Sequence, residues 1–131
     1  MAPKNELTDY KGFKMRVIRE VDEPGEPDYL TMTDRYDGVD ADQRAEYEAQ
    51  DAERLAAFTR GDWYYMYVGV ELFIPTKQNW AALTRVGRAY LHGIESDSEE
   101  SYFNEVAKEL ADEAYDDARC TFEALQGVFQ K

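Results

Sequence analysis

The sequence has almost none of the residues that build cross-links, metal centres and catalytic triads. It contains one cysteine, Cys120, and one histidine, His92, among 131 residues. A single cysteine excludes an internal disulfide, and one Cys with one His cannot supply the four protein ligands of a structural zinc site. A reducing, cytoplasmic compartment is therefore expected.

Long hydrophobic runs are also missing. The longest, from Trp63 to Ile74, is interrupted by Glu71 and is followed by Pro75. Such a run is too short for a transmembrane helix. The first six residues lack the apolar core of a signal peptide. We therefore expect no membrane partner.

Basic residues are scarce, with 15 Lys and Arg against 28 Asp and Glu and a formal net charge of −13. Such a charge repels DNA, RNA and anionic membranes, so direct nucleic-acid binding is not expected and a basic protein partner is favoured. The alternative is that the charge serves solubility alone. An aromatic content of 14% argues against a disordered acidic tail.

The length and the 44% hydrophobic content fit a single domain over residues 1–131. Residues 10–21 alternate in polarity, with Phe13, Met15 and Val17 on one face, which predicts a half-buried strand. Residues 22–39 are acidic and contain prolines and glycines, which predicts a loop.

A helix is predicted from Asp40 to the Arg60-Gly61 step. Asp40 is a good N-cap, Gln43 completes the capping-box pattern, and glycine is a common stop. The apolar stripe of this helix consists mostly of alanines, so it can bury little area.

The clearest predicted strand is formed by residues 63–74. Residues 75–80 are predicted to form a hairpin connection, and residues 83–91 the returning strand. One face of the 63–74 strand is apolar throughout and is expected beneath the last helix. This face consists of Met66, Val68, Val70, Leu72 and Ile74.

The last helix follows the junction at 93–100, where Asp97 with Glu100, or Ser96 with Glu99, fits a capping box. It is predicted to run to about residue 126. Its core stripe is Phe103, Val106, Ala107, Leu110, Ala114, Ala118, Phe122 and Leu125. The predicted fold is α+β: a three-stranded, largely antiparallel sheet in the order β-α-β-β-α, with helices on at least one face.

No enzymatic site is expected. His92 lies near Glu95 and Asp97, but no nucleophile is placed against it, and Cys120 belongs to no motif. The acids around Gly38 lack the calcium-loop spacing. These acids are Asp34, Asp37, Asp40 and Asp42. We therefore expect neither a metal nor a cofactor.

Two surfaces are candidates for binding a partner. The first is the acidic face of the last helix: Glu105, Glu109, Asp112, Glu113, Asp116 and Asp117. Its charges are sparser than those of duplex DNA, which permits a nucleic-acid mimic but also an ordinary solvated face. The second carries Tyr65, Tyr67 and Phe73 in the 63–74 strand, on the side shared by Trp63. It is either buried beneath a second helix or a partly exposed interaction patch.

Several motifs resemble those of small, mostly uncharacterised phage and prophage proteins. The motifs are Tyr10–Val17, Gly61-Asp62-Trp63 with the following Val68-Gly69-Val70, Leu91–Ser98, and Tyr102 with Glu105–Glu113. They cover about half of the chain. His92 stands where the resemblance implies tryptophan, and the region between the first predicted strand and Arg60 has no counterpart.

The resemblance implies a phage protein acting in the cytoplasm of a host cell, and no site residue carries over from it. Small acidic phage proteins of this kind often inhibit host defence, including CRISPR and restriction systems. One alternative is an accessory or assembly protein that self-associates through the aromatic face. Another is a nucleotide-processing or nucleotide-sequestering protein that uses a convergence of basic residues. Those residues are Lys14, Arg16, Arg85 and Arg88.

Overall fold

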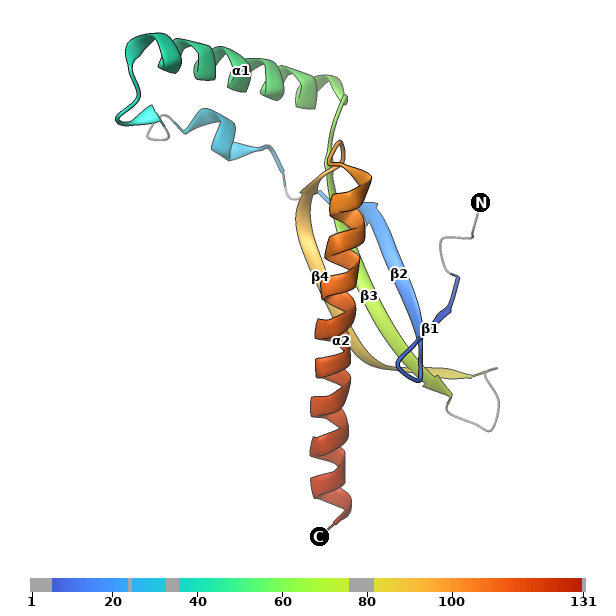
Figure 1. Cartoon of the computed structure of the whole chain (residues 1–131). Coiled ribbons are helices and arrows are strands. Elements are labelled where there is room, and N and C mark those ends of the chain that lie inside the picture. Colours follow the sequence, from blue (N-terminus) through green and yellow to red (C-terminus); the bar gives the residue numbers. More distant parts are fainter. Residues whose placement is uncertain (1–5, 24, 33–35, 76–81, 131) are drawn as a thin grey trace.

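The structure is a computed structural model that describes residues 6–23, 25–32, 36–75 and 82–130. It confirms an α+β class with an antiparallel sheet and two helices (Figure 1). The sheet order is β1 (Thr8–Tyr10), β2 (Phe13–Val21), β3 (Tyr65–Pro75), β4 (Leu83–Glu95). The helices are α1 (Ala41–Arg60) and α2 (Glu100–Phe129), and a 3-10 helix, η1 (Asp28–Thr31), lies in the loop at 22–39.

The predictions of three strands and of the order β-α-β-β-α were wrong, because the first predicted strand contains a hairpin. The element order is β-β-α-β-β-α. Tyr10 pairs with Phe13 across a two-residue turn in which Lys11 and Gly12 have φ angles of 49° and 91°. Positive φ at both turn residues suits the twist of a hairpin, but Asn or Asp usually precedes the glycine. Because lysine occupies that position, the sequence pattern did not predict the turn.

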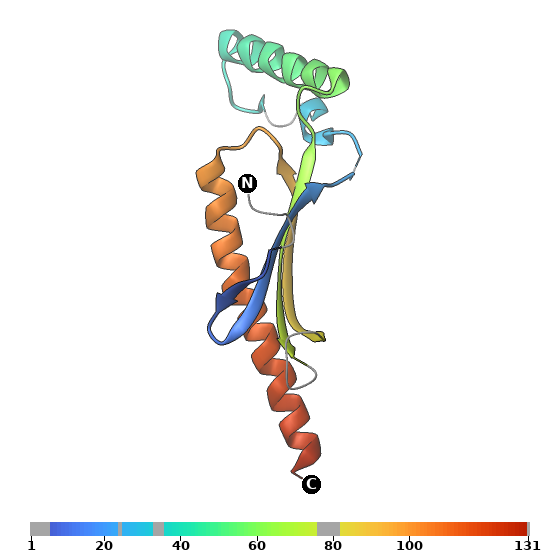
Figure 2. The same ribbon diagram turned by 90° about the vertical axis from the view of Figure 1, so that its right-hand side faces the viewer.

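Helix α2 covers one face of the sheet and encloses the core with β3 and β4 (Figure 2). The close approach of α2 to β4 depends on Gly87. A Cβ atom there would lie 2.3 Å from the carbonyl oxygen of Ala114 and 2.9 Å from Cβ of Ala118. The buried core cluster is Val68, Val70, Leu72, Ile94, Phe103, Val106, Leu110, Ala111 and Ala114.

The predicted apolar face of β3 is only partly enclosed. Val68, Val70 and Leu72 are buried and Met66 packs partly against the core, as predicted. Ile74, however, is 39% exposed, which corrects the prediction. It lies at the end of β3, where the last turns of α2 pass beside the sheet without closing over it.

Helix α2 begins later and ends later than predicted. Its N-cap is Glu99, which makes no side-chain capping bond, so neither Ser96 nor Asp97 caps it. It ends at Phe129. Phe122 and Leu125, predicted in the core, are 61% and 51% exposed, because the helix continues past the sheet that would have covered them.

Helix α1 has the predicted bounds. The Oδ1 atom of Asp40 accepts a hydrogen bond from the backbone N–H of Gln43 at 2.9 Å, and Gly61 ends the helix in the left-handed conformation. No residue of α1 is buried. The helix extends away from the sheet, and the loop that contains η1 packs Leu30 and Tyr36 beside it.

The molecule is elongated. Its accessible surface is 9370 Å², whereas a compact monomer of 15.2 kDa exposes about 7,000 Å². Strand β4 runs past the predicted end at 91 to Glu95. The predicted hairpin connection, apart from Pro75, lies outside the described residues, as does Asp34. Neither helix, over the ranges described, is long and apolar enough to cross a bilayer.

Candidate functional site

The predicted acidic residues of α2 are all exposed. Four of them point away from the core, because 3.6 residues per turn places them within about 80° of one another on the side opposite the buried stripe. We call these four the acidic stripe: Glu105, Glu109, Glu113 and Asp116. Within the described part of the chain, none of the four forms an ion pair or side-chain hydrogen bond.

The other two predicted acids hold parts of the fold in place. The phenol of Tyr10 donates a hydrogen bond to Asp112, and the Lys11 ammonium lies 3.7 Å from the same carboxylate. The hydrogen bond from Tyr10 lowers the pKa of Asp112. The backbone N–H of Arg88 donates to Asp117 at 3.0 Å. These contacts fix the β1–β2 hairpin and β4 against α2.

The sheet face opposite α2 has a buried carboxylate at its centre. Glu71 is 2% exposed. Arg16 donates to its Oε1 atom at 2.5 and 3.0 Å, and Arg85 and Tyr90 donate to its Oε2 atom at 2.5 and 2.8 Å. Burial raises the pKa of Glu71, but the hydrogen bonds from Arg16, Arg85 and Tyr90 outweigh it and lower the pKa to about 2.

This arrangement accounts for two of the four basic residues predicted to converge on a sheet face. Arg16 and Arg85 do converge there, but both bind Glu71. Lys14 forms an ion pair with Asp9 at 2.6 Å. Most of the positive charge on this face is therefore compensated within the fold.

The three predicted aromatic residues are separated into two environments. Tyr65 packs against Trp63 and against Phe58 of α1, with ring centroids 5.4 and 6.1 Å apart. Tyr67 and Phe73 lie on the face that α2 leaves uncovered. Tyr67 donates a hydrogen bond to Glu20 at 2.8 Å, and the Arg16 guanidinium lies 5.3 Å from the Phe73 ring.

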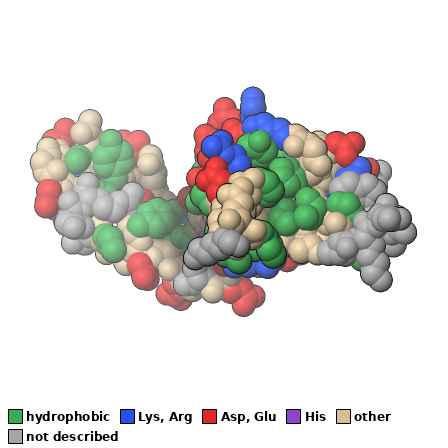
Figure 3. Space-filling model, turned by 90° about the horizontal axis from the view of Figure 1, so that it is seen from below, with side chains coloured by type: hydrophobic (Ala, Val, Ile, Leu, Met, Phe, Trp, Pro, Cys, Tyr) green, Lys and Arg blue, Asp and Glu red, His purple; other side chains and the backbone are tan. Residues whose placement is uncertain are grey.

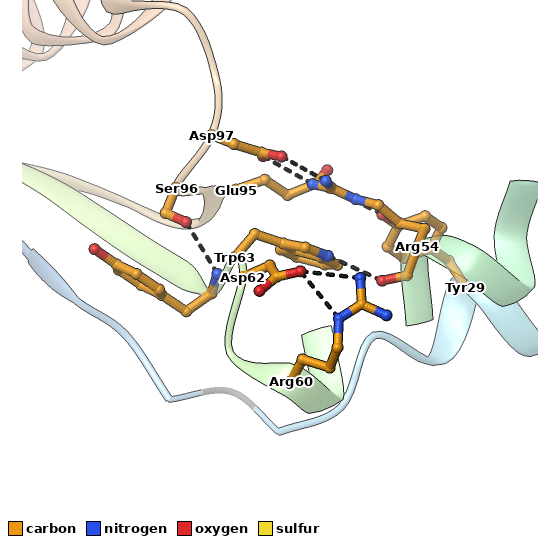
Figure 4. A network of polar contacts seen from close by, with 9 residues as sticks. Tyr29, Arg54, Arg60, Asp62, Trp63, Glu95, Ser96 and Asp97 are labelled. Carbon is orange, nitrogen blue, oxygen red and sulfur yellow. Dashed lines mark hydrogen bonds and ion pairs between the residues drawn. The ribbon is translucent and has the colours of Figure 1, made fainter. Parts of the chain in front are cut away.

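A polar network attaches α1 to the junction between β4 and α2 (Figure 4). Arg54 of α1 donates hydrogen bonds to Glu95 and to both carboxylate oxygens of Asp97. The hydrogen bond from Arg54 lowers the pKa of Asp97. The Trp63 indole N–H donates to the carbonyl oxygen of Arg54 at 2.9 Å, and the guanidinium lies 3.8 Å from the indole ring. We call this set of contacts the Arg54 clamp.

The clamp brings together residues from two motifs of the sequence. The Gly61-Asp62-Trp63 motif and the Glu95-Ser96-Asp97 motif meet here, and the Ser96 hydroxyl accepts a hydrogen bond from the Tyr64 backbone N–H at 2.9 Å. In the structure these residues attach α1. Sequence reasoning missed Arg54 and Glu71, because a charged residue in a helix or strand carries no local sign of a distant partner.

The single histidine and the single cysteine lie in unrelated places. His92 Nδ1 lies 3.2 Å from an Asp22 carboxylate oxygen, and its ring lies 5.2 Å from that of Tyr67. Cys120 is exposed on α2. In the described residues, no three His, Cys, Asp or Glu side chains are grouped so that they could hold a metal ion.

Comparison of the chain with protein-family models, with curated proteins and with solved structures finds no match. These comparisons therefore indicate no function for the chain.

Proposed function

We propose that this protein is a non-enzymatic, phage-type binding protein that occupies the basic, nucleic-acid-handling surface of another protein. The observation that carries the proposal is the acidic stripe, in which four exposed carboxylates have no cationic partner among the described residues. Acids that the fold does not use remain available to a partner. The resemblance to phage proteins makes a component of a host CRISPR or restriction system the partner class we propose.

The charge spacing of the stripe is compatible with partial mimicry of a nucleic-acid strand. Asp116 lies eleven positions after Glu105, or about 16.5 Å along the helix at 1.5 Å per residue, so neighbouring charges of the stripe are about 5.5 Å apart on average. One strand of DNA carries one charge per about 3.4 Å of axis. A groove lined by Lys and Arg attracts such a row of charges, and salt weakens the attraction.

The test compares two fourfold variants with the same change in net charge. One variant neutralises the stripe with Glu105→Gln, Glu109→Gln, Glu113→Gln and Asp116→Asn. The matched control neutralises four exposed acids of α1 with Asp42→Asn, Glu46→Gln, Glu48→Gln and Glu53→Gln. Each tagged protein is used to capture its partner from a lysate of a host that carries CRISPR or restriction systems, at low and high salt.

We expect the wild-type protein and the α1 control to capture a basic nucleic-acid-binding protein at low salt and to displace its DNA or RNA. The stripe variant should lose both effects, while its circular dichroism spectrum stays unchanged. Wild-type affinity and salt response in the stripe variant would overturn the proposal.

One observation favours the second candidate, an accessory or assembly protein that self-associates through its aromatic sheet face. The face with Tyr67 and Phe73 has no helix over it in the described structure. Tyr and Phe are enriched in protein interfaces. This candidate predicts that Tyr67→Ala or Phe73→Ala abolishes association, that the stripe variant associates normally, and that salt has little effect.

A further inference from the structure

The last turns of α2 continue past the core and are not buried by any other described part of the chain. Ala118 is the last buried residue of the helix, and every described residue after it is exposed. The eleven residues from Arg119 to Phe129 correspond to about 16 Å of helix. Figure 1 shows this end of α2 extending beyond the sheet.

This end of α2 keeps the apolar pattern of a buried helix. Phe122, Leu125 and Phe129 follow Ala118 at intervals of four, three and four residues, which is the spacing of a two-helix seam. They are 61%, 51% and 81% exposed. Val128 adds a fourth apolar residue that is 63% exposed.

An apolar groove of about 270 Å³ lies where this end of α2 passes the sheet. Phe13, Ile74 and Val86 of the sheet line it together with residues of α2, which include Phe122 and Leu125. Figure 3 shows hydrophobic side chains gathered at this end of the molecule. An apolar cavity of about 150 Å³ accepts a benzene ring, so the groove has room for a phenylalanine side chain.

The charge of this end favours a second copy of the same chain as the occupant. Residues 118–131 carry Arg119, Glu123 and Lys131, a formal net charge of +1, whereas the remaining residues carry −14. Because the rest of the chain carries this negative charge, two copies repel one another overall. At this end the repulsion is locally absent.

The exposed apolar area is also sufficient. The groups concerned are Phe122, Leu125, Val128, Phe129 and Ile74. A large aromatic side chain has an area of about 150–250 Å². Multiplied by the exposed fractions of these five residues, such areas give about 500 Å² of exposed apolar surface per copy. A symmetric pair then buries about 1,000 Å², which is the lower bound for a specific interface.

We propose that two copies of this chain associate about a two-fold axis through the C-terminal ends of their α2 helices, which run antiparallel. A crossing centred between Phe122 and Leu125 places Phe129 of each copy level with Ala118 of the other, beside the groove. The same patch serves both copies, as a closed two-fold dimer requires. This contact uses neither the acidic stripe nor the aromatic sheet face, so its failure leaves the proposed function standing.

The test measures the mass of the full chain in solution over a range of concentrations by light scattering or sedimentation. We expect about twice 15.2 kDa for the wild-type protein at high concentration. Phe122→Glu combined with Phe129→Glu should halve that mass. Both residues are exposed, so the monomer should stay folded, as circular dichroism will show. The matched control, Val21→Glu at a site that is 56% exposed, should keep the dimer.

The arrangement of the two helices in the dimer can be measured directly with a label on Cys120, because this residue is the only cysteine and is exposed on α2. Nitroxide labels there should give one inter-copy distance of about 25–35 Å, from a helix diameter of about 10 Å and an interaxial distance of 8–10 Å. A wild-type protein that is monomeric at every concentration overturns the proposal. So does a dimer that survives the double substitution but is lost in Phe73→Ala, because association then uses the sheet face.

Discussion

Helix α2 has six buried residues and helix α1 has none, although both are long and carry many acids. The stripe of α2 contains Phe103, Val106 and Leu110, and burial of each such side chain contributes about 1.5–3 kcal/mol. The stripe of α1 consists mostly of alanines, which offer little area to bury. Helical spacing is common to both helices and does not by itself decide which one joins the core; the large buried side chains of α2 distinguish it from α1.

The two helices are therefore attached by different interactions. Helix α2 is held along much of its length by apolar contacts with β3 and β4. Helix α1 is attached at its C-terminal half through the Arg54 clamp and the Phe58–Trp63 ring contact, whose centroids lie 5.0 Å apart. We therefore expect most of the stability of the fold to reside in the α2–sheet body, and α1 to loosen without unfolding that body.

The substitution with the largest expected effect is Val70→Asp, which acts on the α2–sheet body. Val70 is fully buried, and an unpaired buried charge costs several kcal/mol, comparable with a total stability of about 5–15 kcal/mol. We expect loss of the cooperative urea transition and of most of the circular dichroism signal. Val21→Asp, at a site that is 56% exposed, is the control and should cost little. A Val70→Asp protein as stable as the wild type would contradict this assignment of the core.

Lowering the pH is expected to have an intermediate effect on the stability of the α2–sheet body. The folded-state pKa of Glu71 is about 2, against an ordinary value of 4.5. The depressed pKa contributes stability that is fully present above about pH 4.5 and is lost as the pH falls toward 2, because the unfolded chain takes up the proton first. The contribution is about 3 kcal/mol.

Urea titrations between pH 6 and about pH 2 measure this contribution of Glu71. Glu71→Gln should lower stability at pH 6 and flatten the decline below about pH 4.5. Glu48→Gln, at an exposed ion pair of α1, should leave the decline as it is in the wild-type protein. An equally steep acid decline in Glu71→Gln would mean that Glu71 is not the group responsible.

The smallest effect is expected at the Arg54 clamp, where the two helices should respond differently. Arg54→Ala removes the bonds to Glu95 and Asp97. It should cost about 1.5–2 kcal/mol, the lower part of the range for hydrogen bonds to charged groups, because both carboxylates are partly exposed. Hydrogen exchange should accelerate across α1 and stay slow in α2. Arg60→Ala breaks only exposed local pairs with Glu53 and Asp62 and should leave α1 nearly as protected as before. Equal acceleration in both helices would show that α1 and α2 unfold together.

Local signals determined much of the fold. The cap at Asp40, the stop at Gly61, the alternation of β3 and the periodicity of α2 predicted both helices and the central strand. The turn at Lys11-Gly12 was also local but lacked the usual Asn or Asp, so β1 was missed. Ser96 and Asp97 had the local form of caps, yet in the structure they bind Tyr64 and Arg54.

The candidate site was less accessible from the sequence. The acidic character of α2 follows from composition and spacing, but the sequence does not distinguish the acids that the fold uses from those it leaves unpaired. Asp112 and Asp117 become structural only because the β1–β2 hairpin and β4 come to lie beside α2. Likewise, Tyr65 differs from Phe73 only because α1 packs against it.

By itself, the sequence determined which segments are helical or extended, because capping, alternation and periodicity act between residues a few positions apart. The tertiary structure alone decided three things. It placed Glu71 between Arg16 and Arg85, it joined Arg54 to Asp97, and it left Phe122 and Leu125 exposed past the end of the sheet. The physical reason is that burial and ion pairing depend on which elements meet in space, and an apolar stripe is buried only as far as the surface that covers it extends.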